Sequence, residues 1–404
     1  MIKFACDCQM KKHRAPLEGC EISSGAIYKL PEILKDYNRI YLVADKNTYR
    51  AAGELCEKVL RDAGKFSHKF ILEGDIILPN VETLGKIILN ANDPAAKADI
   101  FAYSPLPDLI LAVGSGTVND SCRVVSYRLG IPYGIVATAP SMDGFASASS
   151  SMERSGLKIS LNSKCPEAVI ADPEILVNAP KRMILSGIGD ILAKYVSIVE
   201  WEIAHILVGD FYCETIADIV KDSLAQCVRD AKSAVNGDKR AILSVMEALV
   251  ISGIAMNYAE ISRPASGVEH YISHIVDMRA LEWGTPSDFH GIQCAVATLT
   301  TVRAYEKLFS SEPDREKALA AVSAYDNDKW NAYLREKLGH GAESIIAGEV
   351  KEKKYDKADA KASAFPFSKE ILKENKDVLD KLAMELLDKE TLEEEKIYQI
   401  LSNN

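Results

Sequence analysis

Apolar strand-like runs alternate with amphipathic helical patterns before Asp172, and this alternation constrains the fold more than any other feature. The runs, some of which end in a polar turn, lie at 39–48, 66–72, 108–116 and 133–141. Helical patterns separate them, for example at 49–64 and 119–130. Strands that are apolar over their whole length are typical of a parallel sheet covered by helices on both faces. The sequence therefore predicts a doubly wound, mostly parallel, Rossmann-like α/β domain that binds ligands beyond the carboxyl ends of its strands.

The pattern changes after Asp172–Pro173, where long helical segments replace the strands. One of them, 241–256, is nearly apolar, but it carries Glu247 near its middle and is shorter than the roughly 20 residues that a bilayer requires. We expect a helix buried in a helical core rather than a membrane span. The predicted domains are 1–176, an α/β unit, and 177–404, an all-α unit, with the cleft between them as the expected site.

Composition narrows the classes of partner. The chain has 48 Lys and Arg against 58 Asp and Glu, a net charge of −10. This balance argues against nucleic-acid binding and against anionic membrane surfaces, but it allows a local basic pocket for a small anion. Nine scattered cysteines indicate reduced thiols without a disulfide framework, and the first residues lack the apolar region of a signal peptide. We expect a cytoplasmic protein, with the basic run 351–357 exposed to solvent.

Two polar turns follow neighbouring strands. The first, GSGTVND from Gly114 to Asp120, precedes a helical pattern, and the second, TAPSMDG, runs from Thr138 to Gly144. Glycine lets a backbone approach a ligand closely, and the free N–H groups of a helix start attract phosphate. Asn119 departs from the G-x-G-x-x-G fingerprint, so a tight turn without a ligand is the alternative for the first turn. Together the turns favour a nucleotide site.

Asp45 ends the run that begins at 39. A carboxylate there can accept hydrogen bonds from a ribose and repel a 2′-phosphate, which favours NAD over NADP. The alternative role is that of an N-cap for a helix over 47–63. Lys46 would instead attract a 2′-phosphate, so both cofactors remain open.

Three of the seven histidines lie in one short region. His270 and His274 are four residues apart and so lie on one face of a helix, and His290 follows beside Pro286, where a new helix is expected to start. Asp190 is expected at the head of another helix. Imidazoles and a carboxylate suit a divalent metal that polarises a substrate oxygen. His205 is a competing ligand, but its apolar helix makes a core position the expected one.

The motifs GSGTVND, TAPSMDGFAS, GDILAK, SRPASGVEHYISH and FHG, in this order, resemble the sn-glycerol-1-phosphate dehydrogenases, in particular their bacterial, arabinose-operon-associated branch. That family belongs with glycerol dehydrogenase, the iron-containing alcohol dehydrogenases and dehydroquinate synthase. The resemblance covers about residues 20–310 and implies the dehydroquinate synthase-like fold. It implies a dinucleotide-binding first domain and a metal- and substrate-binding second domain.

The resemblance also implies roles for single residues. The cofactor's pyrophosphate and nicotinamide would lie against Gly114, Ser115, Gly116, Thr117, Val118, Thr138, Ala139, Pro140 and Ser141. Asp45 would bind its ribose, and Ser147 would also contact it. Zinc or nickel, with iron in relatives, would be held by Asp190, His270 and His290. The substrate would contact Asp143, Asp190 and His274, and His274 would relay a proton or donate a hydrogen bond.

The implied reaction is the reduction of dihydroxyacetone phosphate to sn-glycerol 1-phosphate with NAD(P)H, by a homo-oligomer that is expected to be a dimer. Arg263 stands seven residues before His270, the offset at which dehydroquinate synthase carries a phosphate-binding arginine. An ion pair between Arg263 and an acid such as Glu269 is the alternative. Three other functions remain open: a glycerol dehydrogenase, a dehydroquinate synthase-like cyclase and a non-catalytic metal- or nucleotide-binding regulator. Asp190 stands where the cyclase has Glu, which argues against that reading.

Overall fold

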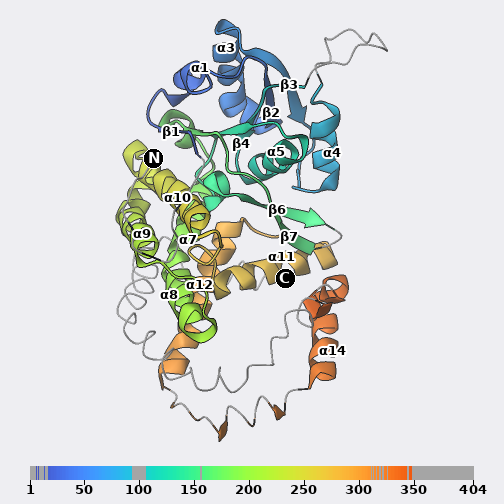
Figure 1. Ribbon diagram of the computed structural model, residues 1–404, viewed down its shortest axis with the longest axis vertical. Coiled ribbons are helices and arrows are strands. Elements are labelled where there is room, and N and C mark those ends of the chain that lie inside the picture. The colour runs from blue at the N-terminus through green and yellow to red at the C-terminus, as the bar shows by residue number, and fades with distance from the viewer. Residues whose placement is uncertain are drawn as a thin grey trace.

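The fold is an α/β half stacked on an all-helical half (Figure 1). In the computed structural model the described residues are 17–92, 106–154, 157–310, 326–343 and 345–347, with isolated positions that include Cys6, Cys8 and His13. The α/β half carries the blue to blue-green part of the chain, and the helical half carries the green, yellow and orange part. The expected exposure of the basic run 351–357 lies outside the described residues.

A six-stranded sheet forms the centre of the α/β half. Its order is β1-β8-β5-β4-β2-β3, and every pairing in it is parallel. The strands are β1 (Gly19–Ile22), β2 (Ile40–Asp45), β3 (Phe66–Leu72), β4 (Leu109–Gly114), β5 (Tyr133–Ala137) and β8 (Ala168–Ala171). Four of the six, β2 to β5, lie within the predicted runs. The prediction of a mostly parallel sheet is confirmed.

Helices cover both faces of the sheet, which explains why its strands are apolar throughout. On one face Leu42 of β2 packs with α1 (Leu30–Ile33) and α3 (Glu54–Asp62). On the other, Tyr41 and Val43 pack with α4 (Val81–Leu89) and α5 (Gly116–Leu129). Consecutive residues of one strand thus enter two separate cores, as the two-residue period of a strand dictates.

The helical half follows β8 directly. Its helices are α6 (Pro173–Leu176), α7 (Lys181–Leu192), α8 (Lys194–Val208), α9 (Glu214–Val235), α10 (Lys239–Ala259), α11 (Val268–Trp283), α12 (His290–Ser310) and α14 (Asn327–Leu338). α10 contributes to the same apolar core as Tyr41 of β2, so the two halves share a buried interface. Its length and hydropathy would allow a membrane span, but 67% of its most apolar window is buried in the protein. It packs as the core helix that the sequence predicts.

Two short strands and a hairpin were not predicted. β1 and β8 have four residues each and lie at and beside one edge of the sheet. The hairpin consists of β6 (Ser149–Arg154) and β7 (Leu157–Asn162), which pair antiparallel as a separate sheet. It extends from the α/β half, and β7 packs against α11 (Figure 1). Its serine-rich sequence contains a single β-branched residue, Ile159, and so lacks the composition that marks a strand.

Candidate active site and metal centre

The first polar turn has the geometry of an anion-binding helix start. β4 ends at Gly114 and α5 begins at Gly116, with Ser115 in extended conformation between them as the N-cap. The Ser115 side chain makes no capping hydrogen bond, so the first N–H groups of α5 are not satisfied by it. A Cβ atom at Gly114 would lie 2.7 Å from Cβ of Val118, so only glycine fits there.

The second turn is hydrogen-bonded to the first. The backbone N–H of Thr138 donates to the carbonyl of Gly114 at 3.0 Å, and Oγ of Ser115 lies 2.5 Å from Oγ of Ser141. The turns therefore form one surface at the carboxyl edge of β4 and β5. This is the position at which doubly wound folds bind their ligands.

The helical half is packed tightly against this surface. Ser186 of α7 donates its hydroxyl to the carbonyl of Ser141 at 2.8 Å. A side chain at Gly187 would overlap the carbonyl oxygen of Pro140, so this glycine is required by the close approach of α7. The contact fixes the helical half relative to the turns.

Asp45 is both the last residue of β2 and the N-cap of the helix that follows. It ends β2 and caps α2 (Lys46–Thr48): Oδ1 accepts from the backbone N–H of Asn47 at 2.7 Å and of Thr48 at 3.0 Å. The hydroxyl of Thr48 accepts from the backbone N–H of Asp45 in return, which completes a capping box. Both of these N–H groups donate to the same oxygen atom, Oδ1. Asp45 also lines the main cavity of the protein.

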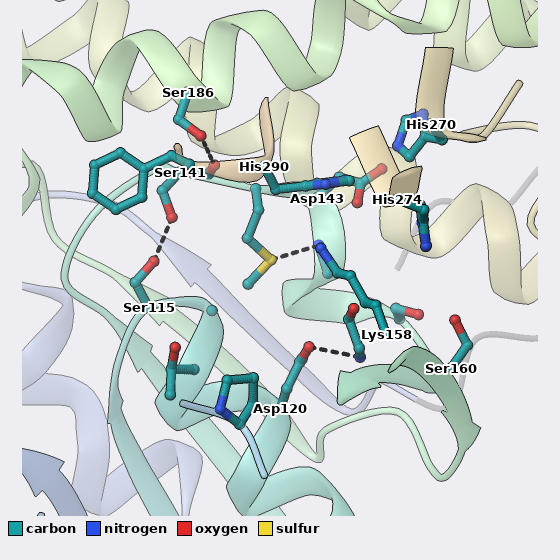
Figure 2. A pocket seen from close by; sticks show the side chains of 18 of the residues that line it. Ser115, Asp120, Ser141, Asp143, Lys158, Ser160, Ser186, His270, His274 and His290 are labelled. Carbon is teal, nitrogen blue, oxygen red and sulfur yellow. Dashed lines mark hydrogen bonds between the residues drawn. The ribbon is translucent and has the colours of Figure 1, made fainter. Parts of the chain in front are cut away.

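A cavity of about 1800 Å³ runs between the two polar turns, the β6–β7 hairpin, α11 and α14 (Figure 2). Most of the residues predicted to form the site line it: Asp45, Ser115, Gly116, Thr117, Val118, Thr138, Ala139, Ser141, Asp143, Ser147, Arg263, His270, His274 and His290. Gly114, Pro140 and Asp190 lie behind its wall. The cavity is therefore shared by the two halves of the molecule, as expected for a cleft site.

Asp190, His270 and His290, the predicted metal ligands, converge beside this cavity together with Cys294. They come from α7, α11 and α12, and one ligand atom of each lies within 4.8 Å of all the others. Nε2 of His270 is 3.7 Å from Oδ1 of Asp190, and Sγ of Cys294 is 3.6 Å from Nε2 of His290. Sequence reasoning missed Cys294, although its position one turn after His290 on α12 was a signal.

Hydrogen bonds behind His270 turn its Nε2 atom toward the cluster. Nδ1 lies 2.8 Å from Oε1 of Glu269, and a carboxylate only accepts, so Nδ1 carries the proton. The backbone N–H of Gly267 donates to the same oxygen at 2.8 Å and holds the carboxylate in place. A histidine backed by a carboxylate is the usual arrangement of a metal ligand.

A second chain of hydrogen bonds orients His290. The amide of Gln293 donates to Asp277 at 2.8 Å, which leaves its Oε1 to accept from the hydroxyl of Ser273 at 2.7 Å. Because that hydroxyl has used its hydrogen, Nδ1 of His290, 3.1 Å away, must donate to it. Nε2 of His290 then presents a lone pair to the cluster. Two imidazole lone pairs and a buried carboxylate thus converge, a donor set that fits a divalent cation.

A buried lysine, Lys194 of α8, connects the metal cluster to Asp143. Its ammonium lies 2.8 Å from Oδ1 of Asp190 and 2.8 Å from Oδ2 of Asp143, and it donates to the carbonyl of Ala265 at 3.0 Å. Burial opposes the charge of Lys194, but the two carboxylates outweigh it and raise the pKa of Lys194 above its ordinary value. Burial raises the pKa of Asp190, and Lys194 more than reverses this, so Asp190 is ionised.

The sequence prediction missed Lys194. The signal for it was its place four residues after Asp190 inside an apolar stretch, because a buried ammonium needs an acidic partner one helical turn away.

His274 lies one turn beyond His270 on α11, half-buried in the cavity wall, with its ring centroid 6.3 Å from that of His290. Burial lowers the pKa of His274 to about 4, and the nearby ammonium of Lys158 adds to the shift. The imidazole is therefore neutral at pH 7 and can both donate and accept. Lys158 comes from β7 and is ion-paired with Asp277. As part of the unpredicted hairpin, Lys158 was also missed.

Arg263 lines the cavity and is held by an acid. Its Nη2 and Nε atoms lie 3.0 and 3.1 Å from Oδ2 of Asp210. The ion-pair alternative thus applies, but with a partner other than Glu269, which binds Gly267 and His270. Asp210 lies in the loop between α8 and α9, and no sequence pattern linked it to Arg263.

Three local predictions were wrong. Asp190 lies in the last turn of α7 rather than at a helix head, because the helix starts at Lys181. α12 begins at His290 itself, four residues after Pro286. His205 is exposed on α8, with Nδ1 2.6 Å from the carbonyl of Asp210, so it does not fill the core.

Comparison with known proteins finds one matching family model and sequence relatives that are named glycerol-1-phosphate dehydrogenase. The model of the family "Iron-containing alcohol dehydrogenase" matches residues 21–180. The glycerol-1-phosphate dehydrogenase (NAD(P)+) of Bacillus velezensis is 36% identical over 327 residues, which cover 78% of this chain and 79% of that protein. The enzyme of the same name from Bacillus subtilis is 33% identical over 71% of this chain and 72% of its own.

Solved structures agree on the fold. A glycerol dehydrogenase from Schizosaccharomyces pombe matches 90% of this chain and 91% of its own, with a TM-score of 0.60 and 18% sequence identity. An iron-containing alcohol dehydrogenase from Thermotoga maritima covers 90% of this chain and 99% of its own, with a TM-score of 0.56 and 12% identity. From its sequence relatives, the chain belongs to the glycerol-1-phosphate dehydrogenase family, and it shares its fold with the two solved dehydrogenases.

Proposed function

We propose that this protein is a metal-dependent, NAD(P)H-linked dehydrogenase that interconverts dihydroxyacetone phosphate and sn-glycerol 1-phosphate. The observation that carries the proposal is one shared cavity. Its walls hold the helix start at Gly116 together with His270 and His290, and Asp190 of the same cluster lies directly behind the wall. Family membership supplies the substrate, since the relatives that cover most of this chain are glycerol-1-phosphate dehydrogenases.

The polar turns would hold the dinucleotide. N–H groups at the start of α5 suit the pyrophosphate, and Ser141 and Ser147 line the same wall. The free Oδ2 side of the Asp45 carboxylate would accept from a ribose hydroxyl and disfavour a 2′-phosphate, which makes NAD the preferred cofactor. Arg50 also lines the cavity, and its guanidinium could pair with the 2′-phosphate of NADP, which would favour NADP instead.

One divalent ion would be held by Asp190, His270 and His290. When bound, it supplies Lewis-acid polarisation of a carbonyl oxygen. Nitrogen and carboxylate donors suit zinc or nickel, with iron as an alternative. The ammonium of Lys194 keeps Asp190 ionised and so ready to bind a cation.

The chain's own residues would position the substrate and handle its proton. His274, neutral at pH 7, can donate a hydrogen bond to a substrate hydroxyl or relay its proton to solvent. Asp143 is fixed by Lys194 and by the hydroxyl of Ser252, which donates to Oδ2 at 2.9 Å. A carboxylate held in this way can orient a hydroxyl of the triose without moving.

Two cations in the cavity are candidates for the phosphate group. Arg263 keeps donors beyond the two that bind Asp210, and Lys158 lies close enough to His274 to lower its pKa. A guanidinium can meet phosphate with two parallel hydrogen bonds, so Arg263 is the preferred anchor. Lys158, which is paired with Asp277, would add a second cation near His274.

The proposal is tested by NADH oxidation after metal reconstitution, with dihydroxyacetone phosphate and unphosphorylated dihydroxyacetone compared side by side. We expect turnover with the phosphate ester and little with the free triose. His270→Ala should lose activity together with the active-site metal while it keeps a folded far-UV spectrum. Equal turnover of the two substrates, or oxidation of glycerol alone, would establish a polyol dehydrogenase instead. Full activity in metal-free protein would remove the metal from the proposal.

A homodimer in the cytoplasm completes the proposal. Ile76 and Leu89 are each 82% exposed, and Val81 is 65% exposed, near the sheet edge formed by β3. Apolar side chains gathered at a sheet edge favour a protein interface. Light scattering on the purified chain measures the oligomer, and cell fractionation measures the location.

A further inference from the structure

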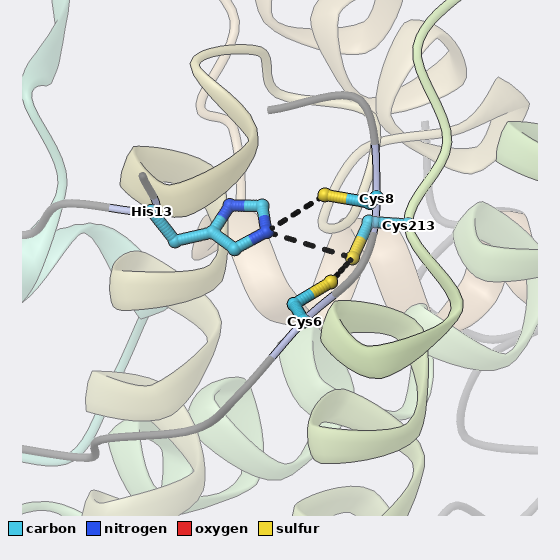
Figure 3. A group of neighbouring side chains, drawn as sticks. All are labelled: Cys6, Cys8, His13 and Cys213. Atoms are coloured by element: carbon cyan, nitrogen blue, oxygen red, sulfur yellow. Dashed lines mark hydrogen bonds between the residues drawn. The ribbon is translucent and has the colours of Figure 1, made fainter. Parts of the chain in front are cut away.

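A second group of potential metal ligands lies away from the active site. It consists of Cys6, Cys8 and His13, which precede β1, and Cys213, which precedes α9 (Figure 3). One ligand atom of each lies within 4.8 Å of the others. The three sulfur atoms and Nε2 of His13 point toward one another in Figure 3. This cluster, the Cys₃His cluster, shares no residue with the active-site cluster.

Its distances are close to those of a tetrahedral zinc site, and two of them are shorter. With Zn–S near 2.3 Å and Zn–N near 2.0–2.1 Å, two sulfur ligands lie about 3.8 Å apart, and sulfur and nitrogen about 3.6 Å apart. Sγ of Cys6 is 3.3 Å from Sγ of Cys213. Nε2 of His13 is 3.1 Å from Sγ of Cys8 and 3.7 Å from Sγ of Cys213. Small outward movements would admit a zinc ion.

His13 is already in the state that a metal ligand requires. Its Nδ1 atom lies 2.8 Å from the carbonyl oxygen of Tyr258, near the end of α10. A carbonyl only accepts, so Nδ1 carries the proton and Nε2 presents a lone pair to the thiols. Such a backbone partner on the far nitrogen is the common way to orient a zinc-binding histidine.

Cys213 lies at the positive end of a long helix. It is the N-cap residue of α9, a helix of 22 residues, and its side chain makes no capping hydrogen bond. The positive end of the helix dipole favours a negative sulfur there. A metal–thiolate bond formed at this position is therefore stabilised by the fold.

The surroundings favour a closed, structural site. Cys6 and Cys8 pack against an apolar cluster that contains Trp201, Ile216 and Tyr258, from α8, α9 and α10. Three sulfur atoms and one nitrogen complete a tetrahedron, which leaves no open position for a substrate. Soft thiolate ligands select zinc over the harder divalent cations.

We propose that Cys6, Cys8, His13 and Cys213 bind a structural zinc ion that fastens the segment before β1 to the start of α9 and the end of α10. The chain would then bind two metal ions, one with a catalytic role and one with a structural role. The first, at Asp190, His270 and His290, belongs to the proposed function. The second holds distant parts of the chain together, and its existence does not depend on that function.

The test measures zinc content in a protein whose active-site cluster is disabled. His270→Ala is expressed with zinc in the medium, purified in the presence of a thiol reductant, desalted and analysed by atomic emission. We expect one zinc per chain in His270→Ala, none after Cys8→Ser is added, and one after the control Cys20→Ser is added. Cys20 is the matched control because it is an exposed cysteine of the same N-terminal region. His13→Gln in the same background should also lose the zinc.

Thiol counting separates zinc from a Cys6–Cys213 disulfide, the alternative for two sulfur atoms this close. For this count the protein is purified without reductant and denatured with chelator, and a zinc site then releases all nine thiols of the chain. A disulfide would leave seven. Seven thiols, or equal zinc content in the Cys8→Ser and Cys20→Ser proteins, would overturn the proposal. Zinc that is lost from both Cys8→Ser and His13→Gln but not from Cys20→Ser would establish it, whether or not the active site binds metal.

Discussion

Lys194 offers the sharpest test of how the site is built, because three polar partners enclose its buried ammonium. Lys194→Met keeps most of the side-chain volume but removes the charge between Asp190 and Asp143. Two buried carboxylates then face each other without their cation. Breaking a buried ion pair in this way costs about 3–5 kcal/mol of folding free energy.

That cost translates into a measurable shift in melting temperature. At about 2.1 cal/mol/K of unfolding entropy per residue, a loss of 3–5 kcal/mol lowers the Tm of a chain this long by about 4–6 °C. Scanning calorimetry of the metal-free proteins measures it. Added Zn²⁺ should recover more Tm in the variant than in the wild type, because the ammonium no longer competes for Oδ1 of Asp190.

Lys239 provides the matched control. Its ion pair with Glu174 is short, at 2.5 Å, but both side chains are 51% exposed. Exposed pairs contribute about 0–1 kcal/mol, so Lys239→Met should shift the Tm by no more than about 1 °C. Equal shifts in the two variants, or an unchanged Tm in Lys194→Met, would refute the view that Lys194 neutralises the buried carboxylates.

Three further predictions follow from single residues. Arg263→Ala should lower kcat/KM for dihydroxyacetone phosphate by roughly ten- to more than a hundredfold, mostly through KM, since a hydrogen bond to a charged group contributes roughly 1.5–3 kcal/mol. An equal loss with unphosphorylated dihydroxyacetone would assign Arg263 to the fold instead. The wild type should use NADH better than NADPH, and Asp45→Gly should narrow that preference; a wild-type preference for NADPH would contradict the role given to Asp45. Burial, opposed by the hydrogen bond from Tyr305, raises the pKa of Glu200 to about 7. The folded protein therefore holds this proton more tightly than the unfolded chain, and stability from this group falls as pH rises from about 4.5 to 7. Urea unfolding of Glu200→Gln should show the variant gaining stability relative to the wild type between pH 5 and pH 8, and parallel profiles would disprove the assignment.

Local patterns were sufficient to predict the strands that carry long apolar runs. β2 and β4 are buried on both faces, so nearly every residue in them is apolar and the pattern is visible in the sequence. β1 and β8, with four residues each, are too short for a pattern. β7 of the hairpin is only half-buried, and its stability comes from α11, which lies more than a hundred residues later.

The candidate site divides in the same way. Residues that are close in sequence, such as His270 and His274 or those of the Gly114 turn, were predictable from their spacing. The pairing of Arg263 with Asp210 and of Lys194 with Asp143 was not predictable, because these acids lie far away in the sequence and only the packing of the helices brings them near. Cys6, Cys8 and His13 form a compact pattern, but the fourth ligand, Cys213, lies 200 residues beyond His13 and only the fold brings it near.

The parallel pairing of β1 with β8 sets an order for synthesis. Gly19 is paired with Ala168, so the two strands are about 150 residues apart in the sequence. During synthesis β1 therefore has no partner strand until these residues have been added. β8 lies between β1 and β5. Until β8 emerges, β5 ends the nascent sheet with unpaired N–H and C=O groups on an apolar strand. The growing chain is therefore most exposed to aggregation in the interval between the synthesis of β5 and that of β8, and this is when a chaperone would be needed.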